Sequence, residues 1–204
     1  MSVQQSLHVI SVMTKSGNKD LLRIEMKNRR AGVCKKEKQE IDQQITQNVI
    51  SSPCFKHAQT VFVYCSTADE IDTYQIISAG LRAGKTICVP RCEKERGLMT
   101  ARQIASMNDL VIGKFGISEP LSTAEMIFPE SIDLCIVPCL TADYQGYRLG
   151  YGGGYYDRFL SRTSCRTAVL CAESRLLREI PKDFYDIPCD YIFTERRILI
   201  RETY

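Results

Sequence analysis

A nearly continuous apolar run, from Asp133 to Leu140, constrains the fold of this chain more than any other feature. A strand with one solvated face alternates polar and apolar residues, so an unbroken run is typical of a strand that is covered on both faces. Other short runs, rich in β-branched and aromatic residues, alternate with helical stretches. The expected strands are 60–65, 85–89, 98–102, 133–140, 167–171 and 191–194, and the expected helices are 19–31, 35–50, a segment that ends near 83, and 155–162.

This alternation predicts the α/β class: a single three-layer domain with a mainly parallel, Rossmann-like sheet and helices on both faces. The length of 204 residues suffices for one substantial core. We expect residues 1–18 to form a flexible leader and residues 19–204 to form the domain. Asn18 is expected to cap the first helix, Gly84 to close the third, and Pro90 to end the second strand.

The segment Arg148-Leu-Gly-Tyr-Gly-Gly-Gly-Tyr-Tyr-Asp157 holds four glycines within five positions. Glycine loses the most conformational freedom on folding, so this density indicates that something approaches the backbone closely. Consecutive amides that open a helix bind phosphate, and in parallel sheets ligands bind at the carboxyl ends of strands. We therefore predict a phosphate-binding loop, in which Arg148 pairs with phosphate oxygens and Asp157 holds a divalent cation.

Two well-known phosphate loops do not match this segment. A Walker loop needs Lys followed by Ser or Thr after its last glycine, and no such pair follows here. The dinucleotide fingerprint G-x-G-x-x-G, counted from Gly150, places Tyr155 where a third glycine allows close packing. Glu173, about 20 residues further on, imitates the acid that binds ribose in that fingerprint. A Rossmann-like, dinucleotide-dependent oxidoreductase therefore stays open as an alternative.

Charge and hydropathy limit the classes of partner. The 27 Lys and Arg residues nearly balance the 24 Asp and Glu residues, and a net charge of +3 does not indicate the basic stripe of a nucleic-acid protein. No run approaches the roughly 18 apolar residues of a membrane span. The first residues lack the charged start of a secretory signal and the arginines of an organelle signal. We expect a cytoplasmic monomer that binds small molecules, and neither nucleic acid nor a membrane.

The ten cysteines are spread over the chain without a CxxC pair, and there are only two histidines, His8 and His57. A disulfide framework and a zinc site are therefore both disfavoured. Free cysteine is common in buried strands, where it behaves as a small hydrophobic residue. This role is expected for Cys65, Cys88, Cys135, Cys139 and Cys171.

Four segments, in order along the chain, carry a more specific signal. Lys19-Asp-Leu-Leu-Arg23 opens a helix, and Tyr64 to Thr73 joins a strand to a helix and contains a glutamate. The glycine segment follows Val-Pro-Cys-Leu-Thr-Ala-Asp143, and Asp186-Ile-Pro-Cys-Asp190 is acidic. Together these segments resemble the 5-formyltetrahydrofolate cyclo-ligase family, also called 5,10-methenyltetrahydrofolate synthetases. The resemblance extends over nearly the whole chain after the leader.

The resemblance implies an ATP-dependent ring closure. In this reaction 5-formyltetrahydrofolate and ATP give 5,10-methenyltetrahydrofolate, ADP and phosphate, with Mg²⁺ as the cofactor. The formyl oxygen attacks the γ-phosphate, nitrogen-10 of the folate attacks the activated carbon, and phosphate leaves. The protein then needs no nucleophile, so its contribution is expected to be alignment and charge neutralisation.

The resemblance also implies residue roles. Lys19 and Arg23, one helical turn apart, are expected to converge on one phosphate group, and Arg148 is expected to be catalytic. Asp157 and Asp186 are the expected Mg²⁺ ligands. The expected ATP-binding residues are Lys19, Arg23, Arg148, Leu149, Gly150, Tyr151, Gly152, Gly153, Gly154, Tyr155 and Tyr156. The expected folate-binding residues are Cys65, Glu70, Tyr151, Gly152, Gly153, Gly154 and Tyr155.

Structural alternatives stand beside these roles. Lys19 and Arg23 also suit a solvated basic face, and Asp157 suits an acid that stabilises the first turn of a helix. Glu70 is expected to accept hydrogen bonds from the pterin nitrogens, or else to cap a helix. One of the two tyrosines after the glycines is as well suited to packing between helix and sheet. A noncatalytic folate-binding protein of the same fold is a second alternative function.

The sequence departs from the family at Tyr151 and Gly153, where some members carry basic residues. Phosphate binding is therefore expected to depend more on Arg148 and on backbone amides. No arginine cluster identifies the site of the folate glutamate tail, and Arg91 and Arg96 are the only candidates.

Overall fold

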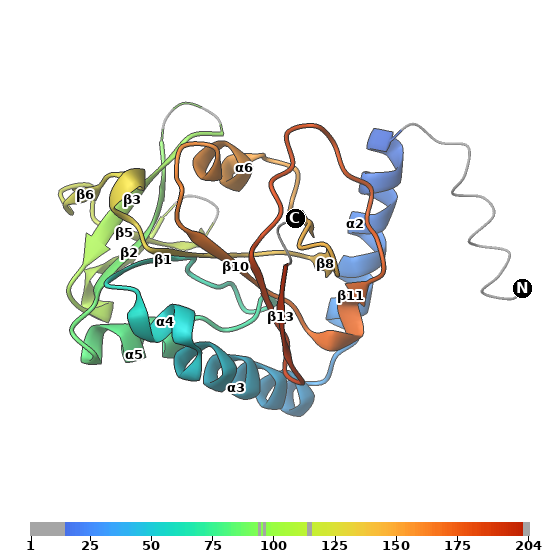
Figure 1. The fold of residues 1–204 in the computed structure, drawn as a ribbon, viewed down its shortest axis with the longest axis horizontal. Helices are drawn as coiled ribbons and strands as arrows, with labels where there is room; N and C mark the ends of the chain where they lie inside the picture. Colours follow the sequence, from blue (N-terminus) through green and yellow to red (C-terminus); the bar gives the residue numbers. More distant parts are fainter. Residues whose placement is uncertain (1–14, 94, 96, 114–115, 202–204) are drawn as a thin grey trace, which may run out of the picture.

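The computed structural model describes residues 15–93, 95, 97–113 and 116–201. Its centre is an eight-stranded sheet in the order β13-β12-β10-β7-β1-β2-β3-β6 (Figure 1). The neighbouring strands from β12 to β2 are parallel, and they are β12 (Tyr191–Phe193), β10 (Arg166–Leu170), β7 (Leu134–Val137), β1 (Thr60–Val63) and β2 (Thr86–Cys92). The antiparallel strands are β3 (Met99–Ile104), β6 (Met126–Ile127) and β13 (Ile198–Ile200). The mainly parallel α/β sheet is therefore confirmed.

Helices cover both faces of this sheet. One face carries three helices, α3 (Lys35–Ser51), α4 (Pro53–His57) and α5 (Tyr74–Arg82), and the other carries α6 (Tyr155–Leu160) (Figure 1). The long helix α2 (Lys15–Ala31) stands at one end of the molecule, beside a second sheet (Figure 1). That sheet has the order β11-β8-β9, with β11 (Leu176–Leu177), β8 (Thr141–Asp143) and β9 (Arg148–Leu149). A separate hairpin pairs β4 (Leu110–Ile112) with β5 (Ser118–Pro120).

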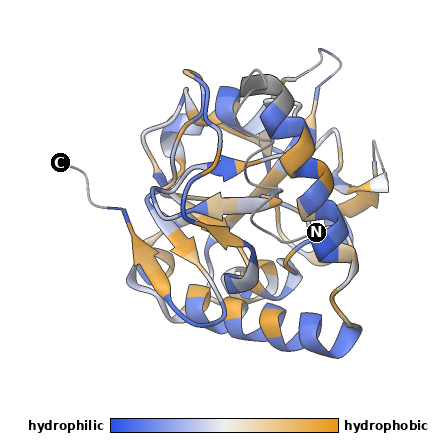
Figure 2. Ribbon diagram, turned by 90° about the vertical axis from the view of Figure 1, so that its right-hand side faces the viewer, coloured by the Kyte–Doolittle hydropathy of each residue, from blue (hydrophilic) through white to orange (hydrophobic). Residues whose placement is uncertain are grey.

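The core lies on both sides of the central strands, as the apolar run predicts. All four residues of β7 are buried. On one face Val61 and Val63 pack with Ile45 and other residues of the helices below, and on the other Phe62 stacks on Phe159 of α6 at 4.6 Å between ring centroids. Burying one such side chain stabilises the fold by roughly 1.5–3 kcal/mol. Figure 2 shows the corresponding pattern, with hydrophobic central strands and with alternating hydrophobic and hydrophilic positions along α3.

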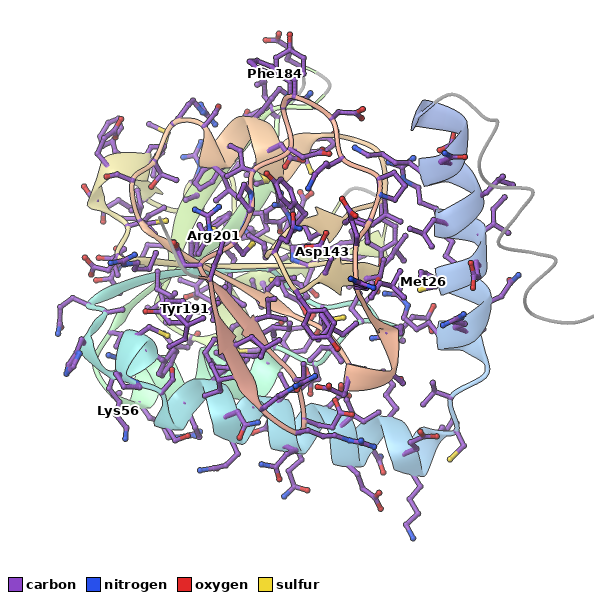
Figure 3. The ribbon with its side chains drawn as sticks, turned by 45° about the vertical axis from the view of Figure 1, so that its right-hand side comes forward. Met26, Lys56, Asp143, Phe184, Tyr191 and Arg201 are labelled. Atoms are coloured by element: carbon purple, nitrogen blue, oxygen red, sulfur yellow. The ribbon has the colours of Figure 1, made fainter. Side chains whose placement is uncertain are left out.

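Helix α2 begins at Lys15, so the prediction that Asn18 caps a helix from residue 19 is wrong. The remainder of the expected leader, residues 1–14, lies outside the described residues. Met26 is 1% exposed and points from α2 toward the body of the molecule, as Figure 3 shows. The helix is therefore docked on the domain by a buried side chain.

Pro90 does not end β2, which continues to Cys92. Strand β1 pairs with β2 only as far as Cys88, and beyond it β2 keeps its antiparallel partner β3, with Pro90 opposite Ala101. A strand with one partner tolerates a residue that lacks an N–H donor. Gly84 has a φ of 72° after α5, which confirms its predicted role at that helix end.

The prediction that five cysteines behave as buried hydrophobic residues is confirmed. All ten cysteines are free, and the five predicted in strands are buried. Within the part of the chain that the structure describes, no group of three His, Cys, Asp or Glu side chains is placed to hold a metal ion. No helix among the described residues is both long and apolar enough to cross a membrane.

Candidate active site

The glycine loop, residues 150–154, joins β9 to α6. Gly152 and Gly154 have φ values of 96° and 66°, a region that disfavours side chains. A Cβ atom on Gly153 would lie 2.7 Å from the Tyr155 ring, whereas one on Gly150 would meet nothing within 4 Å. The conformation of the loop therefore requires glycine at its last three positions and not at its first.

The loop amides are available to a ligand. Among the described residues, no acceptor is found for the backbone N–H groups of residues 151–154. A hollow of about 400 Å³ adjoins the loop and is lined by Glu95, Leu98, Gly152, Gly153 and Arg158. Unsatisfied amides beside such a hollow suit an anionic ligand, because successive N–H groups bind phosphate oxygens.

Asp143 fixes the hairpin from which the loop emerges. It is fully buried, near the centre of the molecule in Figure 3, and accepts hydrogen bonds from the amides of Gln145, Tyr147 and Ile180. Burial raises the pKa of the Asp143 carboxyl, and these amide donors oppose that rise. The acid is therefore a structural group that holds β8 and β9 together.

The predicted cations of α2 reach the site but bind different partners. The Arg23 Nε atom donates to the Gly150 carbonyl at 3.0 Å, so this side chain braces the loop directly. The Lys19 Nζ atom forms ion pairs with Asp183 at 2.7 Å and with Asp186 at 2.5 Å. Burial alone would lower the pKa of Lys19, but the hydrogen bonds that it donates to Asp183 and Asp186, and the charges of these two acids, raise it. Lys19 and Arg23 therefore do not converge on one point here.

Arg148, two residues before the loop, is buried and has partners within the protein. Its side chain is only 4% exposed, and its two terminal nitrogens donate to the Ile187 carbonyl and to the Asp157 carboxylate, each at 2.9 Å. Asp157 also accepts from the Ile187 amide at 3.4 Å. This pair ties α6 to segment 183–187. Both terminal nitrogens have acceptors in this structure, and direct contact of Arg148 with phosphate stays a prediction.

Two of the expected folate-binding residues, Cys65 and Glu70, lie outside the loop, in the segment that follows β1. The Glu70 carboxylate accepts hydrogen bonds from the Thr67 amide and hydroxyl, at 2.9 and 3.1 Å. Burial and the Glu70 charge raise the pKa of Tyr151 to about 12, so the phenol stays protonated. Cys65 is 2% exposed, and burial raises the pKa of its thiol to about 12. Glu70 therefore stabilises the turn of residues 67–70 through these hydrogen bonds, and it also lies close to Tyr151.

The two tyrosines after the glycines differ in surroundings. Tyr156 packs against both core clusters, with its ring 6.4 Å from that of Phe62, and burial raises its pKa well above the ordinary value. Tyr155 is half-buried beside Gly153. Leu149 is buried in β9. Tyr156 and Leu149 are therefore core residues, while Tyr155 stays next to the loop.

The comparison with protein families now bears on this arrangement. The model of the 5-formyltetrahydrofolate cyclo-ligase family matches residues 15–195. The chain belongs to this family. The family model starts at the first residue of α2 and ends after β12, so it includes each part of the site described above.

Relatives of known name agree with the cyclo-ligase family. The 5-formyltetrahydrofolate cyclo-ligase of Escherichia coli (strain K12) is 28% identical over 178 residues, which cover 85% of this chain and 98% of the relative. That of Mus musculus is 26% identical over 198 residues, covering 91% and 98%. The 5,10-methenyltetrahydrofolate synthetase structure from Aquifex aeolicus has a TM-score of 0.81 at 30% identity, over 91% of this chain and 94% of that one. The corresponding Mycoplasma pneumoniae structure, with a TM-score of 0.72 at 19% identity and coverage of 87% and 99%, supports the fold alone.

In this member of the cyclo-ligase family, two arginines at the loop escaped sequence reasoning. Arg158 donates to the carbonyls of Gly97 and Gly153, and so links the loop to the segment before β3. Arg30 donates to the Tyr151 hydroxyl at 2.5 Å, and its guanidinium carbon lies 5.6 Å from the centre of that ring. The place of Arg158 directly after the glycine motif was an available signal, whereas nothing in the sequence pairs Arg30 with Tyr151.

Glu173 does not support the alternative function, a dinucleotide-dependent oxidoreductase. That carboxylate forms an ion pair with Arg197 at 2.5 Å. Burial would raise its pKa, but the hydrogen bonds from Arg197 and Thr194 together with the charges of Arg197 and Arg196 lower it. An acid already engaged in this way is poorly placed to bind a ribose hydroxyl.

Proposed function

We propose that this chain is an ATP-dependent 5-formyltetrahydrofolate cyclo-ligase. The observation that carries the proposal is the glycine loop, whose backbone amides have no acceptor among the described residues. Arg23 of α2 donates to the loop carbonyl of Gly150, and the buried Arg148 pairs with Asp157 in the first turn of α6. The reaction joins nitrogen-10 to the formyl carbon of 5-formyltetrahydrofolate and gives 5,10-methenyltetrahydrofolate, while ATP becomes ADP and phosphate. The cytoplasm and a monomeric state stay predictions for this enzyme.

The glycine loop is proposed to hold the ATP phosphates. The amides of residues 151–154 supply donors, and the hollow beside Gly152 and Gly153 supplies space. Arg23 adds positive charge next to Gly152, because its guanidinium lies within 3.4 Å of the position of a Cβ atom there. Donors held in place before the reaction stabilise the charge that moves between the transferring phosphoryl group and its oxygens.

Arg148 is proposed to act as a positioning residue. Its contacts with Asp157 and Ile187 fix the positions of α6 and of segment 183–187 relative to the loop. The folate is proposed to lie on the flank with Cys65, Glu70 and Tyr151, where the protonated Tyr151 hydroxyl remains a donor. Both substrates then meet at the loop, so that the formyl oxygen can lie in contact with the γ-phosphate, as direct transfer requires.

The donor set near the loop fits a magnesium ion bound together with ATP. Asp157 and Asp186 are 29% and 22% exposed, and each has one carboxylate oxygen without a hydrogen bond to a described residue. Mg²⁺ is typically held by one or two carboxylates, waters and substrate phosphates, so a larger acidic cluster is not required. Asp157 and Asp186 are the residues proposed to hold the ion, which would neutralise phosphate charge.

The test is direct. The purified protein is mixed with 5-formyltetrahydrofolate and magnesium-ATP, and the methenyl chromophore is followed by absorbance, with ATP omitted as the control. We expect the chromophore to form together with ADP in a 1:1 ratio. If both substrates bind and no chromophore forms, the protein is a noncatalytic folate-binding member of the fold and the enzymatic proposal fails.

A further inference from the structure

Arg175 is a buried cation for which the described residues offer no balancing acid. It lies in the turn after β10, is 7% exposed, and its side chain forms no hydrogen bond or ion pair with any described residue. Its Nε atom is buried without an acceptor. Arginine is seldom buried in this way unless it is paired, because the charge loses its hydration. The position therefore suits a guanidinium that receives a negatively charged ligand.

A second arginine, Arg30, also has a buried nitrogen without an acceptor, and it lines the same cavity as Arg175. One terminal nitrogen of Arg30 is buried without an acceptor, while the other donates to Tyr151. Arg30 and Arg175 both line a small cavity of about 20 Å³, whose other lining residues are Val33, Lys38, Ile41, Asp69, Ile71 and Ala172. Arg30 lies in α2 and Arg175 in the turn after β10, so two separate elements each contribute an arginine to the same cavity.

The charges around this cavity favour an anion. Lys38 is already paired with Asp42 at 2.5 Å, and the acid that lines the cavity, Asp69, is exposed to solvent. Counting these groups, three cations stand against two acids. A volume of this size admits one atom about as large as a water molecule. One oxygen of a carboxylate or phosphate group fits this space, with the rest of the group at the mouth.

We propose that Arg175 and Arg30 form an oxyanion-binding site, and that its ligand is a carboxylate of the glutamate tail of the folate substrate. The identity of the ligand rests on the proposed function. The location favours the tail over phosphate, because Asp69 and Ile71 flank Glu70 and Arg30 holds Tyr151, both on the proposed folate flank. A guanidinium fork also matches a carboxylate in geometry.

The candidates from sequence are less well placed for the tail. Arg91 donates to the Pro120 carbonyl at 2.5 Å, so it serves to hold β5 against β2. Arg96 lies outside the described residues. Arg175 and Arg30 are therefore the better basis for tail recognition.

The first experiment measures binding by calorimetry without ATP, so that no turnover is needed. The ligands are 5-formyltetrahydrofolate and a 5-formyltetrahydropterin that lacks the benzoyl-glutamate tail. We expect Arg175→Gln to weaken the tail-bearing ligand about 10-fold, which corresponds to about 1.4 kcal/mol, and to leave the tail-less ligand unchanged. The control is Arg178→Gln, which removes the same charge from an exposed position three residues away and should change neither affinity.

Other results would overturn the proposal. Equal weakening of both ligands would mean that Arg175 only supports the pterin pocket, and no weakening of either would remove the tail site. If Arg175→Gln instead weakens inorganic phosphate and magnesium-ATP, the oxyanion is a phosphate and the tail assignment is wrong. Arg175→Met keeps most of the side-chain volume, and its melting temperature should equal or exceed that of the wild type, because the charge removed has no acid partner among the described residues.

The proposed cyclo-ligase function and the proposed oxyanion-binding site can each fail without the other in these experiments. If the wild type binds 5-formyltetrahydrofolate but does not convert it, the binding comparison still tests the tail site. If the wild type binds no folate at all, the proposed function fails, and glutarate then tests the oxyanion site by itself. We expect glutarate to raise the melting temperature of the wild type and of Arg178→Gln, and not of Arg175→Gln. No difference between these variants would reject the site.

Discussion

At the scale of single residues, Asp157 has two connected tasks. It balances the buried Arg148 guanidinium, and it keeps one carboxylate oxygen that is not bonded to a described residue. The first task concerns stability and the second concerns the proposed Mg²⁺. A substitution that keeps the shape and removes the charge affects both at once.

We expect Asp157→Asn to lower turnover at least 10-fold with the fold intact, and to lower the free energy of unfolding by about 1–3 kcal/mol, because Arg148 loses its charged partner. Turnover is measured by chromophore formation and stability by urea unfolding. Asp20→Asn is the control, since it removes an acid from an exposed pair with Arg23 and should cost less than about 1 kcal/mol. Near-normal turnover in Asp157→Asn would remove this residue from the active site.

The glycines of the loop offer a matched pair of substitutions. Gly152→Ala forces a side chain into a φ of 96°, while Gly150→Ala enters open space. We expect Gly152→Ala to weaken ATP binding at least 10-fold and to cost roughly 1 kcal/mol or more in stability, and Gly150→Ala to change both only slightly. Titration with ATP and urea unfolding measure the two effects. Equal responses of the two variants would contradict the proposed phosphate cradle.

At the scale of elements, sequence patterns predicted the helices and strands that are specified within a single segment of the chain. Helix α3 was predicted almost to the residue because its apolar positions recur at helical spacing, and β7 because its run is apolar throughout. The strands β8, β9 and β11 were missed, since strands of two or three residues exist only through their partners. Asn18 was misplaced because α2 extends one turn further toward the N-terminus than its apolar pattern indicates.

The same limit applies to the site. The glycine loop was predicted because its composition alone demands a special backbone, and Arg23 because its segment resembles the family's first helix. The burial of Arg148 and the convergence of Arg30 with Arg175 depend on contacts between distant segments. No spacing along the chain encodes such contacts, so the pairing of Arg148 with Asp157 and Ile187 was not predicted.

Segment 183–187 is an irregular element that Lys19 anchors to α2. Its tip is exposed, with Phe184 95% exposed and projecting away from the body in Figure 3. Because it lacks a core of its own, its position depends on the ion pairs of Lys19 and on the Arg148 contact with Ile187. Asp186, a proposed magnesium ligand, is therefore held by α2.

We expect Lys19→Gln to destabilise the protein by roughly 1–2 kcal/mol at pH 7, with allowance for the half-exposed Asp183. The folded-state pKa of Lys19 is raised above 10.5, so the ion pairs stabilise the fold fully below that pH, and the stabilisation is lost as the pH rises above it. Urea unfolding at pH 7 and pH 11 checks this, with the exposed Lys36→Gln as control. A difference from wild type that does not shrink at pH 11 would contradict the assignment.

At the scale of the whole molecule, the reactivity of the cysteine thiols toward an alkylating reagent shows whether the fold is intact. Cys65 has a pKa of about 12, so only about one molecule in 10,000 carries its thiolate at pH 8. Cys34 is exposed before α3. We expect iodoacetamide at pH 8 to modify Cys34 and to leave Cys65 and the other buried cysteines unmodified until urea is added. Peptide mass spectrometry locates the label, and early labelling of Cys65 would show that the end of β1 opens in the native state.

The docking of α2 has a consequence for biosynthesis. This helix is made before its partners, since Gly150, Asp183 and Asp186 follow as much as 167 positions later. At a synthesis rate of about 5–20 residues per second, the helix waits on the order of 10 s before its partners leave the ribosome. Over that interval the apolar side chain of Met26 has no domain to bind, so the nascent chain depends on α2 remaining unaggregated until segment 183–187 has been made.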